Sequence, residues 1–329
     1  MSDSAPDRPN VPRWLHVWAI LTACLALPLV ALGAEVTTKQ VGMADTTSVR
    51  EPWYLATLAK GELWAQGPGL IIEHSHRTAG WLVGMAAIVL AVGMWFGARG
   101  TGLRLAGLLG LLLVIAQGLL GIFRVSLNAR IGPEMAMVHG LFAQIVFATL
   151  VGIAVVTSRT WRRIVPAVDS AGIRRLAAFL AAATYLQIVF GALVRHQQSP
   201  HAQRAHALFA FAVVAGVVWL VKEIWQESED VSVRRAAGIL VGLVVIQVGL
   251  GVESWLRRFG AGVPVETLPP NLVSDLVRSA HFLVGALLFS TTVAMNLLLY
   301  RPRTITSSDA GTAVTPAAAP DYARVGGVL

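Results

Sequence analysis

A short stretch at residues 70–84, LIIEHSHRTAGWLVG, places ionisable side chains at the mouth of a long apolar run. Glu73 and His76 are three residues apart, so on a helix they share one face. A carboxylate at a reacting group can transfer a proton or stabilise a developing cation. The same carboxylate can instead pair with Arg77 four residues on, or interact with the helix dipole. Both interpretations stay open at this point. Either would account for an acidic residue near a membrane span, where charged side chains are strongly penalised.

Four of the eight histidines share one property, because each lies near the start of an apolar run. They are His76, His139, His206 and His281. His76 and His206 are 130 positions apart, and the segments QGLLGI (117–122) and QVGLGV (247–252) have the same offset. One offset shared by separate features predicts the duplication of a four-helix unit. The duplication relates His76 to His206 and His139 to His281. Each four-helix half then carries one pair, His76 with His139 or His206 with His281.

The elements that must position these histidines are apolar runs of about 17 to 24 residues, and a helix needs roughly 20 apolar residues to cross a bilayer. The chain is 55% hydrophobic and 13% charged, whereas soluble domains carry about 25% charged residues. We therefore predict an all-α membrane protein with eight transmembrane helices, arranged as two pseudo-symmetric four-helix bundles. The predicted spans are 14–34, 78–98, 105–123, 135–158, 176–194, 205–221, 236–252 and 279–300.

The domain organisation follows from these spans and from the charges between them. Five arginines lie in the short connection SRTWRRIVPAVDSAGIRR, which predicts a cytoplasmic connection and cytoplasmic termini by the positive-inside rule. The net charge of +8 is attributed to this topology and not to nucleic-acid binding. The histidines then lie toward the outer face. The predicted parts are a cytoplasmic N-terminus (1–13), an N-terminal half (14–158), a cytoplasmic linker (159–175), a C-terminal half (176–300) and a disordered cytoplasmic tail (301–329).

One histidine on each of two facing helices can hold a haem iron at both axial positions, while the apolar helices bury the macrocycle. Arginines at the helix mouths can pair with haem propionates. The candidates at the outer helix ends are Arg77, Arg195, Arg204 and Arg278. The alternatives are interhelical hydrogen bonds, a divalent metal site and a proton relay.

The two halves differ beside their first histidine. Position 203, which corresponds to Glu73, is a glutamine. Only the pair His76–His139 therefore has an acid next to a ligand candidate. This asymmetry favours one site for chemistry and one for electron transfer.

The segment IIEHSHRTAGWLVG resembles the Glu-x-x-His-Arg motif of the haem A synthases, the CtaA/Cox15 proteins. The resemblance extends over roughly residues 14–300 and includes GAEVTT after the first span and GALVRH after the fifth. It implies oxidation of a ring methyl of haem O to a formyl group, giving haem A. It implies a membrane enzyme whose C-terminal half binds a haem b cofactor and whose N-terminal half binds the substrate haem. The implied location is the inner membrane, and the implied partners are haem O synthase and an electron acceptor.

Residue roles follow from this resemblance. Glu73 would be the catalytic carboxylate. His206 and His281, with Arg204 and Arg278, would bind haem b, whereas His76 and His139, with Arg77, would bind the substrate haem; the four histidines would ligate haem iron.

The chain departs from many bacterial members, which carry a cysteine pair in the first outer loop. Cys24, its single cysteine, lies in the first span. The main rival function is a di-haem b cytochrome that only transfers electrons, which needs the four histidines but not Glu73. A transporter would need broken helices and polar residues at the midplane, which the spans do not indicate.

Overall fold

The computed structural model describes residues 11–44, 67–161, 171–260, 262–263 and 268–301. Within these ranges the chain forms eight α-helices and no β-strand. The helices are α1 (Arg13–Thr38), α4 (Pro68–Gly97), α5 (Thr101–Ser126), α6 (Asn128–Thr157), α7 (Ala171–Gln197), α8 (Pro200–Glu227), α9 (Val231–Phe259) and α10 (Leu272–Tyr300). Most of the predicted N-terminus, of the predicted tail, of the predicted linker and of the predicted first outer loop lies outside the described residues.

All eight helices are long and apolar enough to cross a membrane, with a mean hydropathy of 1.9 to 2.3 in their most apolar windows. The predicted all-α class with eight membrane-length helices is confirmed. Large apolar side chains are also exposed on the outer faces of the bundle, and Phe96, Leu208 and Phe211 are each at least 70% exposed. A bilayer is the solvent that such faces match.

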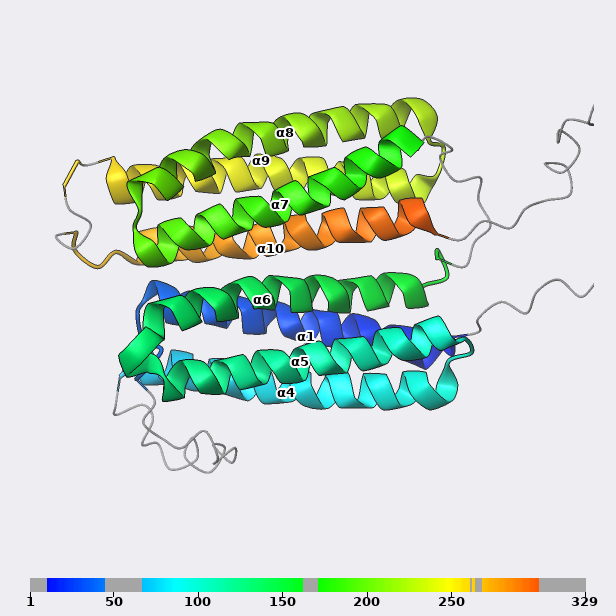
Figure 1. Ribbon diagram of the computed structural model, residues 1–329, viewed down its shortest axis with the longest axis horizontal. Coiled ribbons are helices and arrows are strands. Elements are labelled where there is room, and N and C mark those ends of the chain that lie inside the picture. The colour runs from blue at the N-terminus through cyan, green and yellow to red at the C-terminus, as the bar shows by residue number, and fades with distance from the viewer. Residues whose placement is uncertain (1–10, 45–66, 162–170, 261, 264–267, 302–329) are drawn as a thin grey trace, which may run out of the picture.

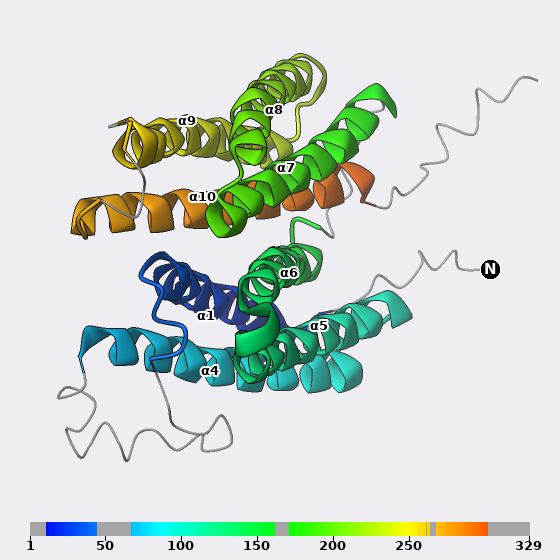
Figure 2. The ribbon, with the colours of Figure 1, turned by 60° about the vertical axis from the view of Figure 1, so that its left-hand side comes forward.

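The helices form two groups of four that follow the chain order. Helices α1, α4, α5 and α6 pack together, as do α7, α8, α9 and α10, and the groups meet along α6, α1, α10 and α7 (Figure 1; Figure 2). An apolar cluster at this boundary includes Val30, Phe147 and Ala286. This arrangement supports the predicted four-plus-four organisation, whose internal symmetry stays a prediction.

The helices that carry the four histidines begin earlier than their apolar runs. Helix α4 begins at Pro68 and not near residue 78, so His76 lies two turns inside the helix. Charged residues extend the helix because they bond within it, as Arg77 does with Glu73. Helix α6 contains a bend at Ile131, where φ is −143° and ψ is 36°, two residues before Pro133. Proline removes a backbone donor and clashes with the preceding turn, which explains the bend.

Side-chain caps mark the beginnings of three helices in the C-terminal half, α8, α9 and α10. Ser199 caps α8 by accepting a hydrogen bond from the backbone N–H of Ala202, and Asn271 caps α10 in the same way. Asp230 caps α9 at Ser232 and also forms a buried ion pair with Arg301, just beyond the end of α10. Caps of this kind satisfy N–H groups that have no partner within the helix.

Candidate functional site

The four predicted histidines form two facing pairs. The ring centres of His76 on α4 and His139 on α6 are 6.4 Å apart, and their planes cross at 81°. The ring centres of His206 on α8 and His281 on α10 are 6.1 Å apart, at 80°. The structure thus brings together the residues that the repeat paired, once in each group of helices.

These separations fit a metal ion held between two imidazoles. A metal–imidazole bond is about 2.0 Å long and the bonded nitrogen lies about 1.1 Å from the ring centre, so two rings on opposite sides of one ion are centred about 6.2 Å apart. Both pairs lie within a few tenths of an ångström of this value. Crossed ring planes are compatible with this arrangement, because each ring can present one nitrogen to the ion whatever its angle to the other ring.

A glycine on a neighbouring helix lies against each of the four histidine rings. A Cβ added at Gly33 of α1 would be 2.9 Å from Cε1 of His76, and one at Gly191 of α7 would be 3.0 Å from Cε1 of His206. The corresponding distances are 3.3 Å for Gly121 of α5 and His139, and 3.1 Å for Gly251 of α9 and His281. Any side chain at these positions would displace the ring from its place.

The close approach to glycine lets two of the rings reach a helix carbonyl. The Nδ1–H of His76 donates to the backbone oxygen of Leu29 at 3.1 Å, and that of His206 donates to the backbone oxygen of Gln187 at 3.1 Å. A proton on Nδ1 leaves the Nε2 lone pair for a metal, and bonds of this kind fix both the tautomer and the ring orientation of ligand histidines. In both rings Nε2 therefore keeps the lone pair that a metal ligand needs.

Three glutamines contact the histidines in a way that was not predicted from the sequence. The side-chain N–H of Gln187 donates to the backbone oxygen of His206 at 2.8 Å, and that of Gln117 donates to the backbone oxygen of His139 at 3.1 Å. The amide nitrogen of Gln247 lies 3.4 Å from Nε2 of His281. Each glutamine precedes a ring-contacting glycine by four residues, so the spacing Gln-x-x-x-Gly was the signal available in the sequence.

Glu73 is buried beside the N-terminal pair, with 3% of its side chain exposed. Nη2 of Arg77 donates to its Oε1 at 2.7 Å, so the i,i+4 ion pair that the spacing allowed is formed. Arg124 of α5, another residue that the sequence analysis missed, interacts electrostatically with both Glu73 and Arg77. The C-terminal half has the half-buried Gln203 in place of this acid.

The other predicted arginines are placed differently from one another. Arg204 is exposed, two positions from His206. Arg278 donates to the backbone oxygen of Thr38 at 3.1 Å. Arg195 donates to the backbone oxygen of Ala34 at 2.7 Å and to Oγ1 of Thr38 at 2.5 Å. Two of the four arginines therefore join the C-terminal half to α1 at the end where the histidines lie.

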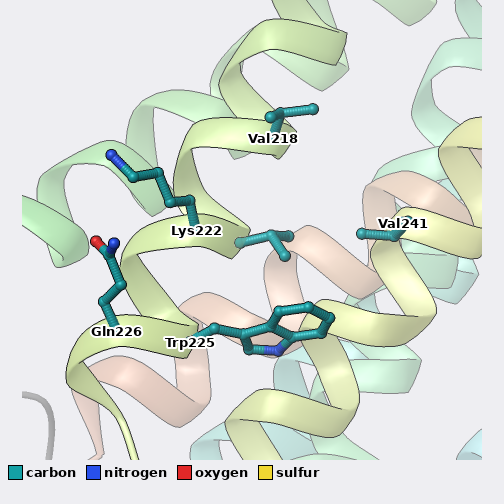
Figure 3. Close-up of a pocket in the computed structure, with 6 residues that line it drawn as sticks. Val218, Lys222, Trp225, Gln226 and Val241 are labelled. Carbon is teal, nitrogen blue, oxygen red and sulfur yellow. The ribbon is translucent and has the colours of Figure 1, made fainter.

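Two further observations concern possible sites elsewhere. Among the described residues, His, Cys, Asp and Glu side chains form no group of three or more that could hold a metal ion. A groove between α8 and α9 is lined by residues that include Val218, Trp225 and Val241 (Figure 3). With a helical rise of 1.5 Å per residue, its Lys222 lies roughly 24 Å along α8 from His206, far from the histidine pairs.

Fold and site together define a helical protein of the membrane class with two pairs of facing histidines, only one of them beside a buried acid. A family model, COX15-CtaA, described as a cytochrome oxidase assembly protein, matches residues 62–203. Proteins named "Heme A synthase" from Listeria monocytogenes serotype 4a, Listeria innocua serovar 6a and Listeria welshimeri serovar 6b are each 25% identical over 317 residues, covering 88% of this chain and 97% of the relative. These matches confirm the resemblance to the CtaA/Cox15 family that was found in the sequence.

Proposed function

We propose that this protein is a haem A synthase, an oxidoreductase that converts a ring methyl of haem O into a formyl group through hydroxylated intermediates. The observation that carries the proposal is the difference between two equally spaced histidine pairs, of which only His76–His139 has the buried pair Glu73–Arg77 beside it. The names of the relatives support the same activity.

The two pairs then have different roles. His76 and His139, with Arg77, bind and orient the substrate haem, whereas His206 and His281 hold haem b, with Arg204 and Arg278 as proposed propionate partners. The bound haem b supplies one-electron transfer, while the protein supplies position and electrostatics. The separations of both pairs fit this assignment.

Glu73 is the proposed catalytic group. Conversion of a methyl to a formyl group adds one oxygen atom, from water or dioxygen, and removes two hydrogens from the reacting carbon; a positioned carboxylate can accept the protons that are released. The ion pair with Arg77 offsets the cost of burying the Glu73 charge and holds its side chain in one orientation. The electrons leave to a separate acceptor.

The proposed setting is the inner membrane, with both termini in the cytoplasm and the histidine pairs toward the outer side. The arginine-rich connection between the two halves supports this orientation. Haem O synthase is the proposed supplier of the substrate.

The experiment is expression of the chain with a haem O synthase in cells that lack haem A, followed by acid extraction and reverse-phase chromatography of the haems. Glu73→Gln is compared with Glu253→Gln, because Glu253 also pairs with an arginine four residues on, at 2.6 Å, but on the exposed surface of α9. We expect haem A or its hydroxylated precursor from the parent and from Glu253→Gln, and little from Glu73→Gln. Only haem b and unconverted haem O from the parent, with bis-histidine spectra intact, would favour the di-haem electron-transfer cytochrome.

A further inference from the structure

The two halves differ at the residue four positions before the first glycine, which is Leu29 on α1 and Gln187 on α7. Gln187 and His206 form a reciprocal pair of hydrogen bonds. The ring of His206 donates to the backbone oxygen of Gln187, and the side chain of Gln187 donates to the backbone oxygen of His206. Only the NH₂ group of an amide can bond to a carbonyl, so this amide has one orientation.

His76 has the first of these bonds without the second. Its ring donates to the backbone oxygen of Leu29 at 3.1 Å, the same distance as for His206. A leucine side chain has no donor for the backbone oxygen of His76. The ring contacts are thus alike in the two halves, but the attachment of helix to helix is not.

The ring contacts of the two first histidines correspond closely, although the buried pair Glu73–Arg77 stands beside His76 alone. A glycine contacts the ring in both halves, Gly33 for His76 and Gly191 for His206. The amide nitrogens of Gln117 and Gln247 lie 3.2 Å and 3.4 Å from Nε2 of the second histidine of each pair, and Gln117 in addition donates to the backbone oxygen of His139. The exchange of leucine for glutamine is therefore a local difference in how the first histidine of each pair is held.

This difference bears on how easily each histidine leaves a metal. Releasing a haem requires a ligand ring to move away from the iron. A ring that is hydrogen-bonded to a neighbouring helix can move relative to that helix only if the bond breaks. His206 is tied to α7 at both ring and backbone, so its displacement breaks two interhelical bonds. Displacement of His76 breaks one.

Resting on the proposed function, we propose that Leu29 and Gln187 determine which haem is retained and which is exchanged. Gln187 acts as a positioning residue that makes the His206–His281 pair a retaining site for a resident cofactor. Leu29 leaves the His76–His139 pair a releasing site, as an enzyme needs for a haem that enters as substrate and leaves as product.

The test measures haem loss from the purified full-length protein loaded with haem b, using excess apomyoglobin as acceptor. We expect two phases in the parent, assigned with His139→Ala and His281→Ala, which each remove one pair. Gln187→Leu should accelerate the slow phase, and Leu29→Gln should slow the fast phase. The expected change is about threefold to twentyfold, the range that one interhelical hydrogen bond in a membrane protein supports.

Gln144→Leu is the matched control, because Gln144 is a buried glutamine of α6 with neither amide atom in a hydrogen bond. We expect both phases of this variant to match the parent. Slower release from Leu29→Gln is a gain that general loosening of the bundle would not produce, and it decides the matter if Gln187→Leu fails to fold. A single phase in the parent, or two phases that neither substitution changes by more than twofold, would overturn the inference. Failure of both pairs to bind haem would instead refute the proposed function itself.

Discussion

Replacing Gly251 with alanine tests whether the absence of a side chain is what positions His281. The added Cβ would lie 3.1 Å from Cε1 of His281, whereas ordinary van der Waals contact begins at 3.4 Å. The ring must therefore retreat by roughly 0.3 Å, which weakens the packing on one side. Binding sites need their groups within about 0.5 Å of the productive geometry, so alanine uses most of that tolerance and valine should exceed it.

The expected loss of haem affinity can be estimated from the known effect of residues that orient metal ligands. Loss of such support typically lowers metal affinity by about 10-fold to 100-fold. We expect Gly251→Ala near the lower limit and Gly251→Val at the upper limit or beyond. The helix itself should not suffer, because alanine in a helix interior is favoured over glycine by about 1 kcal/mol.

The assay is haem b titration of the purified protein, followed by absorption spectroscopy, with circular dichroism to confirm the helical content. Gly249→Ala is the matched control on the same helix, because an added Cβ there has no atom within 4 Å. We expect weaker haem binding by the C-terminal pair for Gly251→Ala alone, with helical content unchanged in both variants. Equal haem affinity in the two variants would refute the reasoning.

Two further predictions concern stability. Asp230→Ala leaves Arg301 without its buried partner and uncaps α9; breaking such a pair costs about 3–5 kcal/mol, so the thermal unfolding temperature in detergent should fall by several degrees, and an unchanged temperature would contradict the burial of the pair. Thr38→Val removes the hydroxyl that bonds Arg195 and Ser279 and should destabilise the contact between the halves by about 1–3 kcal/mol, measured by thermal unfolding. Thr37→Val removes only a bond within α1, and a loss equal to that of Thr38→Val would count against a special role for the boundary.

The fold was predictable because its signals are local. Each span is a long apolar run, and run length alone identifies a membrane helix. The first residues of the helices were harder to predict from the sequence. Helix α4 continues through Glu73 and Arg77, which a hydropathy criterion treats as an interruption but which the helix accommodates as an i,i+4 ion pair.

The histidine pairs were predictable from the repeat, whereas their supports were not. Gln187 sits in QIVFG, which shares only its glutamine and its glycine with the matching segments QGLLG and QVGLG. Its role depends on a hydrogen bond to a backbone atom, and backbone atoms leave no mark in a sequence. The close approach of Gly191 to a ring on another helix is equally invisible without coordinates.

The arginines show the limit of arguments from position along a helix. Arg204 lies two residues from His206, about 200° around the helix, so its exposure follows from helical periodicity. Arg195 and Arg278 instead bond to Thr38, more than 150 residues away in the chain. Partners at that separation are set by tertiary packing, which the pattern of one segment does not contain.

The contact of Thr38 with α10 also has a consequence for biosynthesis. The hydroxyl of Ser279 donates to Oγ1 of Thr38 across 241 positions of the chain. At synthesis rates of about 5–20 residues per second, the last helix emerges roughly 12 to 48 seconds after the first. The end of α1 that carries Thr38 therefore lacks this partner until α10 has been synthesised, and a chain truncated before α10 would leave it exposed to the quality-control machinery of the cell.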